Sequence, residues 1–180
     1  DGREIQIQAD TVVAADGVWT QQLPELKDQL PLRPIKGQFV RVRGETLITR
    51  TVRTPDVYMI PRDEGEIYIG ATSEEVGFDS SLRAGATMDL LWQAWRALPG
   101  IYELTIEQMG VGFRPALRDN LPLIDRGPLE GLIIATGHYR HGIMLAPVTG
   151  QRVLEMIQTK GIPESLKPFG WDRFNQHNGN

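Results

Sequence analysis

The sequence predicts a mixed α/β fold of the α+β type, in which an antiparallel sheet is flanked by helices. Three observations predict it. Four β-like runs follow one another over residues 32–71, and the turn at residues 63–65 has the composition of a hairpin. Apolar residues recur at three- and four-residue spacings over residues 86–98, as on an amphipathic helix. A fully apolar run over residues 131–136 then leads into a glycine and a second helical pattern.

The first 31 residues predict two short strands and a helix. Residues 4–8 alternate in polarity and residues 11–15 are apolar, so we expect a hairpin or sheet edge. Gly17 then begins a helical pattern of roughly two turns, which Pro31 ends.

The remaining elements follow from the same periodicities. Strands are expected at residues 32–43, 47–53, 57–61, 66–71, 105–113, 121–124 and 131–136. The first long helix ends at Pro99-Gly100, and the second runs from about Gly142 to Ile157. Residues 164–180 are mostly polar and predict a tail.

Composition excludes several classes of protein. The 180 residues are 41% hydrophobic and 23% charged with a net charge of −4, as in an ordinary globular protein. Without clustered Lys or Arg, we expect no nucleic-acid or anionic-membrane surface, and no apolar run is long enough to span a bilayer. The absence of cysteine excludes disulfides, thiolate metal sites and a Cys nucleophile, and a reducing cytoplasm is the expected compartment.

The segment most informative about chemistry is the passage from the apolar strand into the second helix. Gly137 and Gly142 would let another molecule approach the backbone closely. The first N–H groups of the helix would favour an anionic or electron-rich partner. From these residues alone, a cofactor site and an ordinary turn are equally well supported.

Here the sequence resembles a known family. GHYRHGIMLAPVTG, residues 137–150, resembles the flavin-contacting motif G-H-x-R-x-G-I-x-L-A-P-x-T-G of the glycine oxidase and D-amino-acid-oxidase-like flavoenzymes. Other segments resemble the same family in the same order, so the similarity covers most of the chain. They are TVVAADGVW (11–19), LRPIKGQ (32–38), YMIPRDEGEIYIGATSEEVGFD (58–79) and GFRPALRDNLPLID (112–125).

The resemblance implies a division of the chain. Residues 1–31 and 110–165 would be the C-terminal part of an FAD-binding, Rossmann-like domain, residues 32–109 an antiparallel-sheet substrate-binding domain, and residues 166–180 a tail. The family's G-x-G-x-x-G loop, which holds the FAD diphosphate, is not found in these 180 residues. We expect it to lie in a segment before Asp1.

The resemblance also implies an activity. Family members use FAD to oxidise a small amino acid or amine to an imine, which hydrolyses to an oxo acid and ammonia, while dioxygen takes up the electrons and becomes hydrogen peroxide. No side-chain base is obligatory, so we expect no catalytic residue in the sense of an acid, base or nucleophile.

Site residues are carried over from the family's motifs. Tyr58, Arg114 and Arg140 would bind the substrate, the first two through its carboxylate. Taken alone, Arg114 suits a surface ion pair and Tyr58 a sheet-packing ring. The expected FAD-binding residues are Gly137, His138, Tyr139, Arg140, His141, Gly142, Ile143 and Met144.

Two positions depart from the family pattern. Asp16 stands where a small residue is usual, and its charge would repel a nearby diphosphate unless it points away. Asp56 stands where glycine oxidase often has a His, which leaves the preferred amine open. His138 and His141 are three residues apart, but no third ligand is suitably spaced, so no metal site is expected.

Two other functions stay open. Without the diphosphate loop, the isolated chain would act only as a β-rich binding or assembly domain and show no oxidase activity. Alternatively, the protein is an FAD-dependent dehydrogenase of sarcosine, proline or D-amino acids. Whether it forms a homo-oligomer is also left open.

Overall fold

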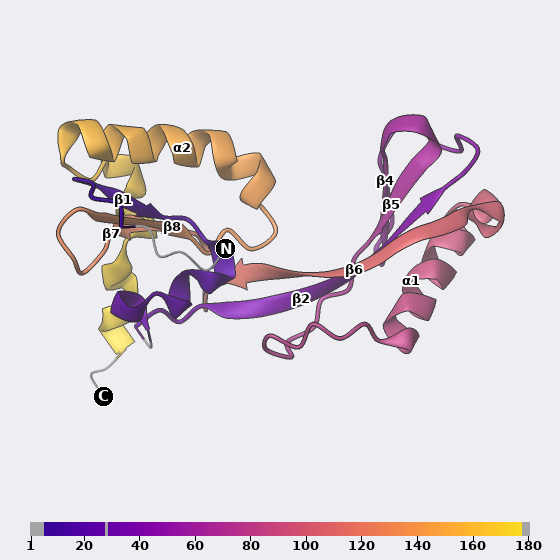
Figure 1. Ribbon diagram of the computed structural model, residues 1–180, viewed down its shortest axis with the longest axis horizontal. Coiled ribbons are helices and arrows are strands. Elements are labelled where there is room, and N and C mark those ends of the chain that lie inside the picture. Colours follow the sequence, from indigo (N-terminus) through magenta and orange to yellow (C-terminus); the bar gives the residue numbers. More distant parts are fainter. Residues whose placement is uncertain (1–5, 28, 178–180) are drawn as a thin grey trace. The chain divides into compact units, whose positions relative to one another are not determined.

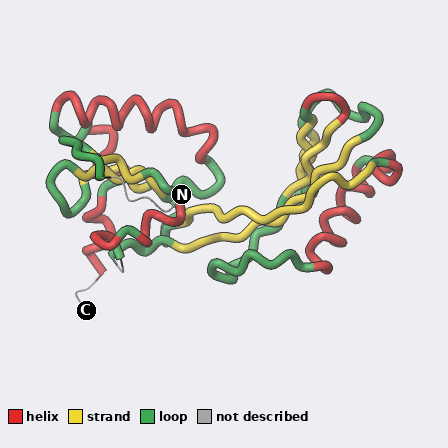
Figure 2. The backbone as a smooth tube through the Cα atoms, in the orientation of Figure 1, coloured by secondary structure: helices red, strands yellow, loops and turns green. Residues whose placement is uncertain are grey.

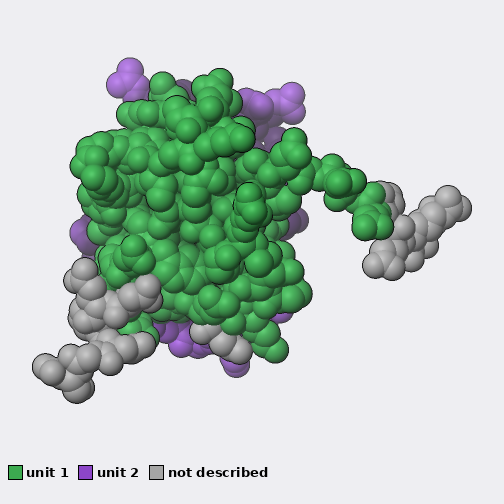
Figure 3. Space-filling model, turned by 90° about the vertical axis from the view of Figure 1, so that its left-hand side faces the viewer, with its two compact units in different colours: residues 1–33, 114–180 green, residues 34–113 purple. Residues whose placement is uncertain are grey.

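The chain folds into two compact units. The computed structural model describes residues 6–27 and 29–177. Unit 1 comprises residues 1–33 and 114–180, and unit 2 comprises residues 34–113 (Figure 3). Unit 2 is therefore inserted into the sequence of unit 1.

Unit 2 is built on an antiparallel sheet, as predicted (Figures 1 and 2). Its strands are β2 (Arg33–Arg43), β3 (Val52–Arg53), β4 (Tyr58–Pro61), β5 (Glu66–Gly70) and β6 (Thr105–Ala116), in the order β3-β4-β5-β2-β6. The pairs β3–β4, β4–β5 and β5–β2 are antiparallel. Glu64 and Gly65 have φ values of 55° and 74°, which lets the chain turn tightly between β4 and β5.

Helix α1 (Ala84–Ala97) packs on one face of this sheet. Leu90 and Ala94 point inward and are buried, because the apolar positions follow the period of the helix. Pro99 ends α1 and begins a 3-10 helix over Pro99–Glu103. The buried residues of this core are Val40, Val42, Val57, Met59, Ile67, Ile69, Leu90, Ala94 and Ile101.

The strand predicted over residues 47–53 is shorter than expected. Only Val52 and Arg53 pair with β4. Leu47 and Ile48 instead pack against the core of unit 2 from a loop. Their apolar character reflects this burial, which a short run of residues does not distinguish from strand pairing.

Unit 1 contains a three-stranded sheet in the order β1-β8-β7. β1 is Val12–Ala14, β7 is Leu123–Arg126 and β8 is Leu132–Thr136. β8 pairs with β1 in parallel and with β7 antiparallel. Of the two predicted alternatives at the N-terminal end, the sheet edge is confirmed, because β1 is an edge strand in the order β1-β8-β7. The hairpin is wrong for the described residues, because residues 6–9 form no strand; residues 4 and 5 lie outside them. An apolar run such as residues 11–15 is typical of a parallel strand, whose partner is distant in sequence.

Helix α2 (Gly142–Thr159) completes unit 1. Val153 and Met156 pack with Ile124, Ile133 and Leu166 in its core. The helix predicted after Gly17 is instead two 3-10 helices, Gly17–Gln22 and Pro24–Leu26. The α-helix cannot continue because Leu23, which precedes a proline, is extended (φ −61°, ψ 130°).

The segment predicted as a tail contains two more 3-10 helices, Glu164–Phe169 and Trp171–His177. The Trp171 N–H donates to the Asp125 carboxylate at 2.7 Å, and Arg173 pairs with Asp119 at 2.8 Å. No helix in the described part of the chain has the length and apolar character needed to cross a membrane.

Candidate functional site

The carboxyl ends of β1 and β8 lie side by side, because the two strands are parallel neighbours. Asp16-Gly17 follows β1, and the glycine-containing turn at residues 137–141 follows β8. The Thr136 hydroxyl donates to the Gly17 carbonyl at 2.6 Å and joins the two connections. Ligands of α/β sheets commonly bind beyond the carboxyl ends of parallel strands.

The turn after β8 requires a glycine at its first position. Gly137 has a φ of 78°, and a Cβ atom there would collide with the side chain of Leu117. Two residues later, the Tyr139 N–H donates to the Pro115 carbonyl at 2.8 Å. Ala116 also pairs with His138 across an antiparallel bridge. The end of β6 is thus held against the turn.

This backbone contact brings two predicted substrate-binding residues into one region. Arg114 directly precedes Pro115, and Arg140 directly follows Tyr139. The Arg140 side chain is exposed, and its guanidinium carbon lies 5.3 Å from the centre of the Tyr139 ring. Two guanidinium groups on adjoining segments suit the binding of a carboxylate.

His138 connects the turn to α2. Its Nε2 atom is 3.0 Å from the Thr149 hydroxyl. Burial lowers the pKa of the His138 imidazole, so the ring is neutral near pH 7. The side chain therefore holds the helix in place, and the segment offers a ligand mainly its backbone.

The first turn of α2 presents backbone donors and exposed apolar side chains together. The N–H groups of the first helical residues have no partner within the helix and carry its partial positive charge. Gly142 begins the helix, Ile143 is 96% exposed and Met144 is also exposed. The eight residues predicted to bind FAD therefore form one continuous segment, which combines free backbone N–H groups with the exposed apolar side chains of Ile143 and Met144.

Tyr58 lies in unit 2, on the sheet face opposite α1. Its ring stacks with Tyr68 at 6.3 Å between centroids, and Tyr68 stacks with Phe39 at 4.7 Å. Gly70 makes room for Tyr58, because a Cβ atom there would lie 2.8 Å from the phenol oxygen. The sheet therefore carries a row of aromatic rings, with Tyr58 at one end.

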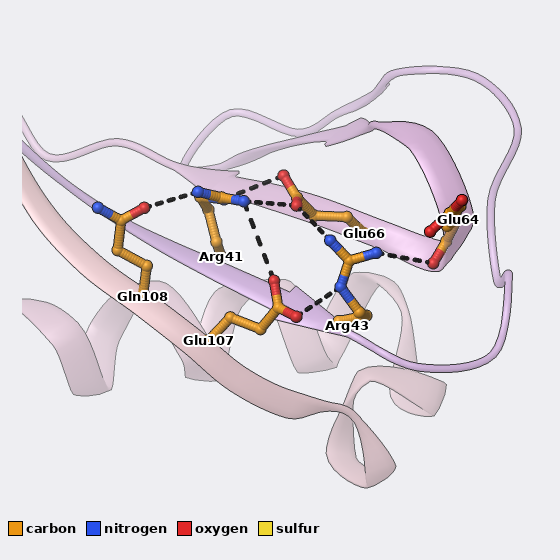
Figure 4. A network of polar contacts seen from close by, with 6 residues as sticks. All are labelled: Arg41, Arg43, Glu64, Glu66, Glu107 and Gln108. Atoms are coloured by element: carbon orange, nitrogen blue, oxygen red, sulfur yellow. Dashed lines mark hydrogen bonds and ion pairs between the residues drawn. The ribbon is translucent and has the colours of Figure 1, made fainter.

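The same face carries a network of charged side chains that we did not predict (Figure 4). Arg41 donates to Glu66 at 3.0 Å through Nε, and Arg43 reaches the same carboxylate at 2.8 Å. Both guanidinium groups also interact with Glu107. The hydrogen bond from Arg41 lowers the pKa of the Glu66 carboxyl. Protein carboxylates therefore neutralise both Arg41 and Arg43.

A second missed group lies on the opposite face of β2. Lys36 is fully buried, and its Nζ atom is 3.6 Å from an Asp79 carboxylate oxygen and 3.9 Å from one of Glu74. Gln38, also buried, donates to Glu74 at 2.7 Å and accepts from the Arg83 N–H at 2.8 Å. These contacts fix the segment between β5 and α1. Strand alternation could have indicated them, because both residues share the parity of Val40 and Val42.

The two departures from the family pattern are both exposed. Asp16 begins the first 3-10 helix, where its carbonyl accepts from the Trp19 N–H. Asp56 lies in a turn held by the Thr54 hydroxyl and borders a 550 Å³ cavity in unit 2 that Glu74 also lines. Within the described residues, no three His, Cys, Asp or Glu side chains are grouped to hold a metal ion.

A family model described as FAD dependent oxidoreductase matches residues 1–156. The chain belongs to this family. The resemblance drawn from the ordered motifs is therefore confirmed.

Relatives within the FAD dependent oxidoreductase family narrow the similarity further. The chain is 37% identical to the bifunctional protein ThiO/ThiG of Trichormus variabilis over 173 residues, which are 93% of the chain and 26% of the relative. It is 36% identical to the glycine oxidase of Geobacillus kaustophilus over 92% of the chain and 45% of that protein. The crystal structure of that glycine oxidase matches with a TM-score of 0.83 over 95% of the chain and 46% of the solved chain. The chain thus spans less than half the length of these relatives.

Proposed function

We propose that this chain belongs to an FAD-dependent oxidase that acts on a small amino acid or amine, as glycine oxidase does. The observation that carries the proposal is the hydrogen bond between Tyr139 and Pro115. It joins the Arg114 segment to the turn that would bind the cofactor. The similarity to proteins named glycine oxidase supports the same substrate class.

We assign a role to each part of the chain on this basis. Residues 1–31 and 110–165 contribute to an FAD-binding domain, residues 32–109 form the substrate-binding domain, and residues 166–180 form a C-terminal extension. Tyr58, Arg114 and Arg140 are the proposed substrate-binding residues.

The segment from Gly137 to Met144 fits a flavin. Gly142 presents backbone without a Cβ atom, and the start of α2 offers N–H groups beside the exposed Ile143 and Met144 side chains. Backbone donors would meet the polar edge of the ring system and the apolar side chains its hydrocarbon surface. Bound FAD would supply the two-electron oxidation of the substrate C–N bond.

The protein's own contribution is to orient the substrate. Arg114 and Arg140 would hold the carboxylate by charge-assisted hydrogen bonds, and the Tyr58 phenol would add another. A carboxylate held in this way directs the neighbouring C–N bond toward one position. The site then requires no general base, in agreement with a neutral His138 that is already engaged with Thr149.

The test compares full-length protein with an Arg114→Ala variant. We expect kcat/KM for glycine to fall roughly 100-fold, because a bidentate ion pair with the substrate is lost, while flavin absorbance is retained. Arg118→Ala is the matched control, since Arg118 is an exposed arginine four residues away. Oxidation of glycine, sarcosine, proline and D-alanine is measured by peroxide release and by dye reduction.

Three outcomes separate the alternatives. Peroxide release that is lost in Arg114→Ala supports the oxidase. Dye reduction without peroxide would instead identify a dehydrogenase. Full activity in Arg114→Ala, or a full-length protein that binds no flavin, would contradict the proposal.

A further inference from the structure

Helix α1 has an outer face that is unusually apolar. Met88, Trp92 and Trp95 are 67%, 54% and 38% exposed. The two indole rings pack on each other with centroids 5.0 Å apart. With Tyr102 and Met109, these side chains line a surface groove of about 710 Å³ within unit 2. Single exposed apolar residues are ordinary, but a contiguous patch of Trp, Tyr and Met is typical of a protein interface.

The spacing of these residues follows the helix. Positions 84, 88, 91, 92 and 95 lie on one stripe, because neighbours on a helix are three or four residues apart. The opposite stripe carries Leu90 and Ala94, which are buried in the core of unit 2. Leu91, on the outer stripe, is partly buried against that core, whereas Met88, Trp92 and Trp95 remain exposed.

Two opposite charges border this stripe on the same side. Asp89 and Arg96 are both exposed and are seven residues apart, which places them about 10 Å apart along the axis. No ion pair of either residue occurs among the described residues. The centre of the Asp89–Arg96 interval lies between Trp92 and Gln93, in the middle of the apolar stripe.

We propose that this face binds a second copy of the same chain through antiparallel pairing of the two α1 helices. A two-fold axis beside Trp92 would bring the two Trp92 rings together at the centre. The same axis would place Asp89 of each copy opposite Arg96 of the other, because the bordering charges lie on the same side of both helices. The surface is thus complementary to itself in charge as well as in apolar character, which is the requirement for an isologous contact.

The test is charge reversal in the full-length protein, with self-association measured by analytical ultracentrifugation over a concentration series. Asp89→Arg and Arg96→Asp should each weaken self-association by about tenfold or more, because each places like charges opposite one another twice. The double variant carrying both changes should restore it, since the pairs are re-formed with exchanged signs. Glu45→Arg is the matched control, because it makes a similar charge change at an exposed position of unit 2.

The double variant separates pairing from misfolding. The antiparallel arrangement is supported if self-association is restored in the double variant and the thermal transition of each single variant is unchanged. The proposal is overturned if the wild-type protein stays monomeric, as it would if another segment or a different protein covered α1. It is also overturned if the single variants behave like Glu45→Arg, or if the double variant associates no better than the single ones.

Discussion

At the scale of single residues, the candidate site depends on backbone conformation more than on reactive side chains. Gly137 is the example, because its φ of 78° and the adjoining Leu117 side chain both exclude a Cβ atom. The glycine itself is visible in the sequence. Its collision partner is not visible there, because Leu117 is 20 positions away in the sequence. Leu117 reaches the turn through the contacts of Pro115 and Ala116 with Tyr139 and His138.

Replacing Gly137 by alanine should lower the free energy of unfolding by about 3 kcal/mol, from left-handed backbone strain and overpacking against Leu117. Flavin content should fall with it if the turn binds FAD. Gly150→Ala serves as the control, because position 150 is helical and open, so alanine should stabilise α2 by about 0.5–1 kcal/mol. Urea unfolding of the full-length variants checks both values, and equal stability of Gly137→Ala and wild type would refute the steric explanation.

At the scale of elements, the side chains of strand β2 alternate between the two faces of the sheet, and the two faces differ in composition. Its odd-numbered residues, including Phe39, Arg41 and Arg43, lie on the aromatic and charged face, and its even-numbered residues from Lys36 to Val42 lie toward α1. Elements were predictable from the sequence where the hydrophobic pattern extends over many residues, as in β2, α1 and α2. Short runs were less predictable: Leu47 and Ile48 are apolar because a loop packs on the core, and residues 11–15 are apolar because β1 pairs with a distant strand.

Gln38→Leu should lower the free energy of unfolding by about 2–3 kcal/mol, because it removes the acceptor of the Arg83 N–H and a donor to Glu74. Gln29→Leu is the control, since Gln29 is exposed and donates to a single carbonyl. Thermal or urea unfolding measures the difference. If the two variants lose the same stability, Gln38 does not fix the start of α1.

At the scale of the whole molecule, both units depend on carboxylates held in their charged form. Hydrogen bonds from Arg41 lower the pKa of Glu66, and hydrogen bonds from Ser81 and then Arg83 lower that of Asp79. Burial would raise the pKa of Asp119, but the interactions with Arg173 outweigh it and the pKa is lowered. These networks join residues far apart in sequence, such as Asp119 and Arg173, so no local pattern could predict them.

The free energy of unfolding should therefore decrease as the solution becomes acidic. A carboxyl whose pKa is lower in the folded than in the unfolded state stabilises the fold above its unfolded pKa of about 4, and this contribution is lost as the pH falls through the folded value. Urea midpoints measured from pH 7 to pH 3 should decrease, and less steeply in Glu66→Gln and Asp119→Asn. The exposed Glu45→Gln should leave the slope unchanged. Identical slopes in all variants would assign the acid sensitivity to other groups.

The parallel pairing of β1 with β8 also has a consequence for biosynthesis. Val12 pairs with Leu132, so at about 5–20 residues per second the ribosome needs on the order of ten seconds to deliver the partner strand. Unit 2 is contiguous, and all of its strands and α1 are translated within that interval. The ribosome therefore delivers all of unit 2 before β8. During this interval the apolar Val12 and Val13 have no partner strand, so chaperones or neighbouring chains on the same messenger RNA can bind them.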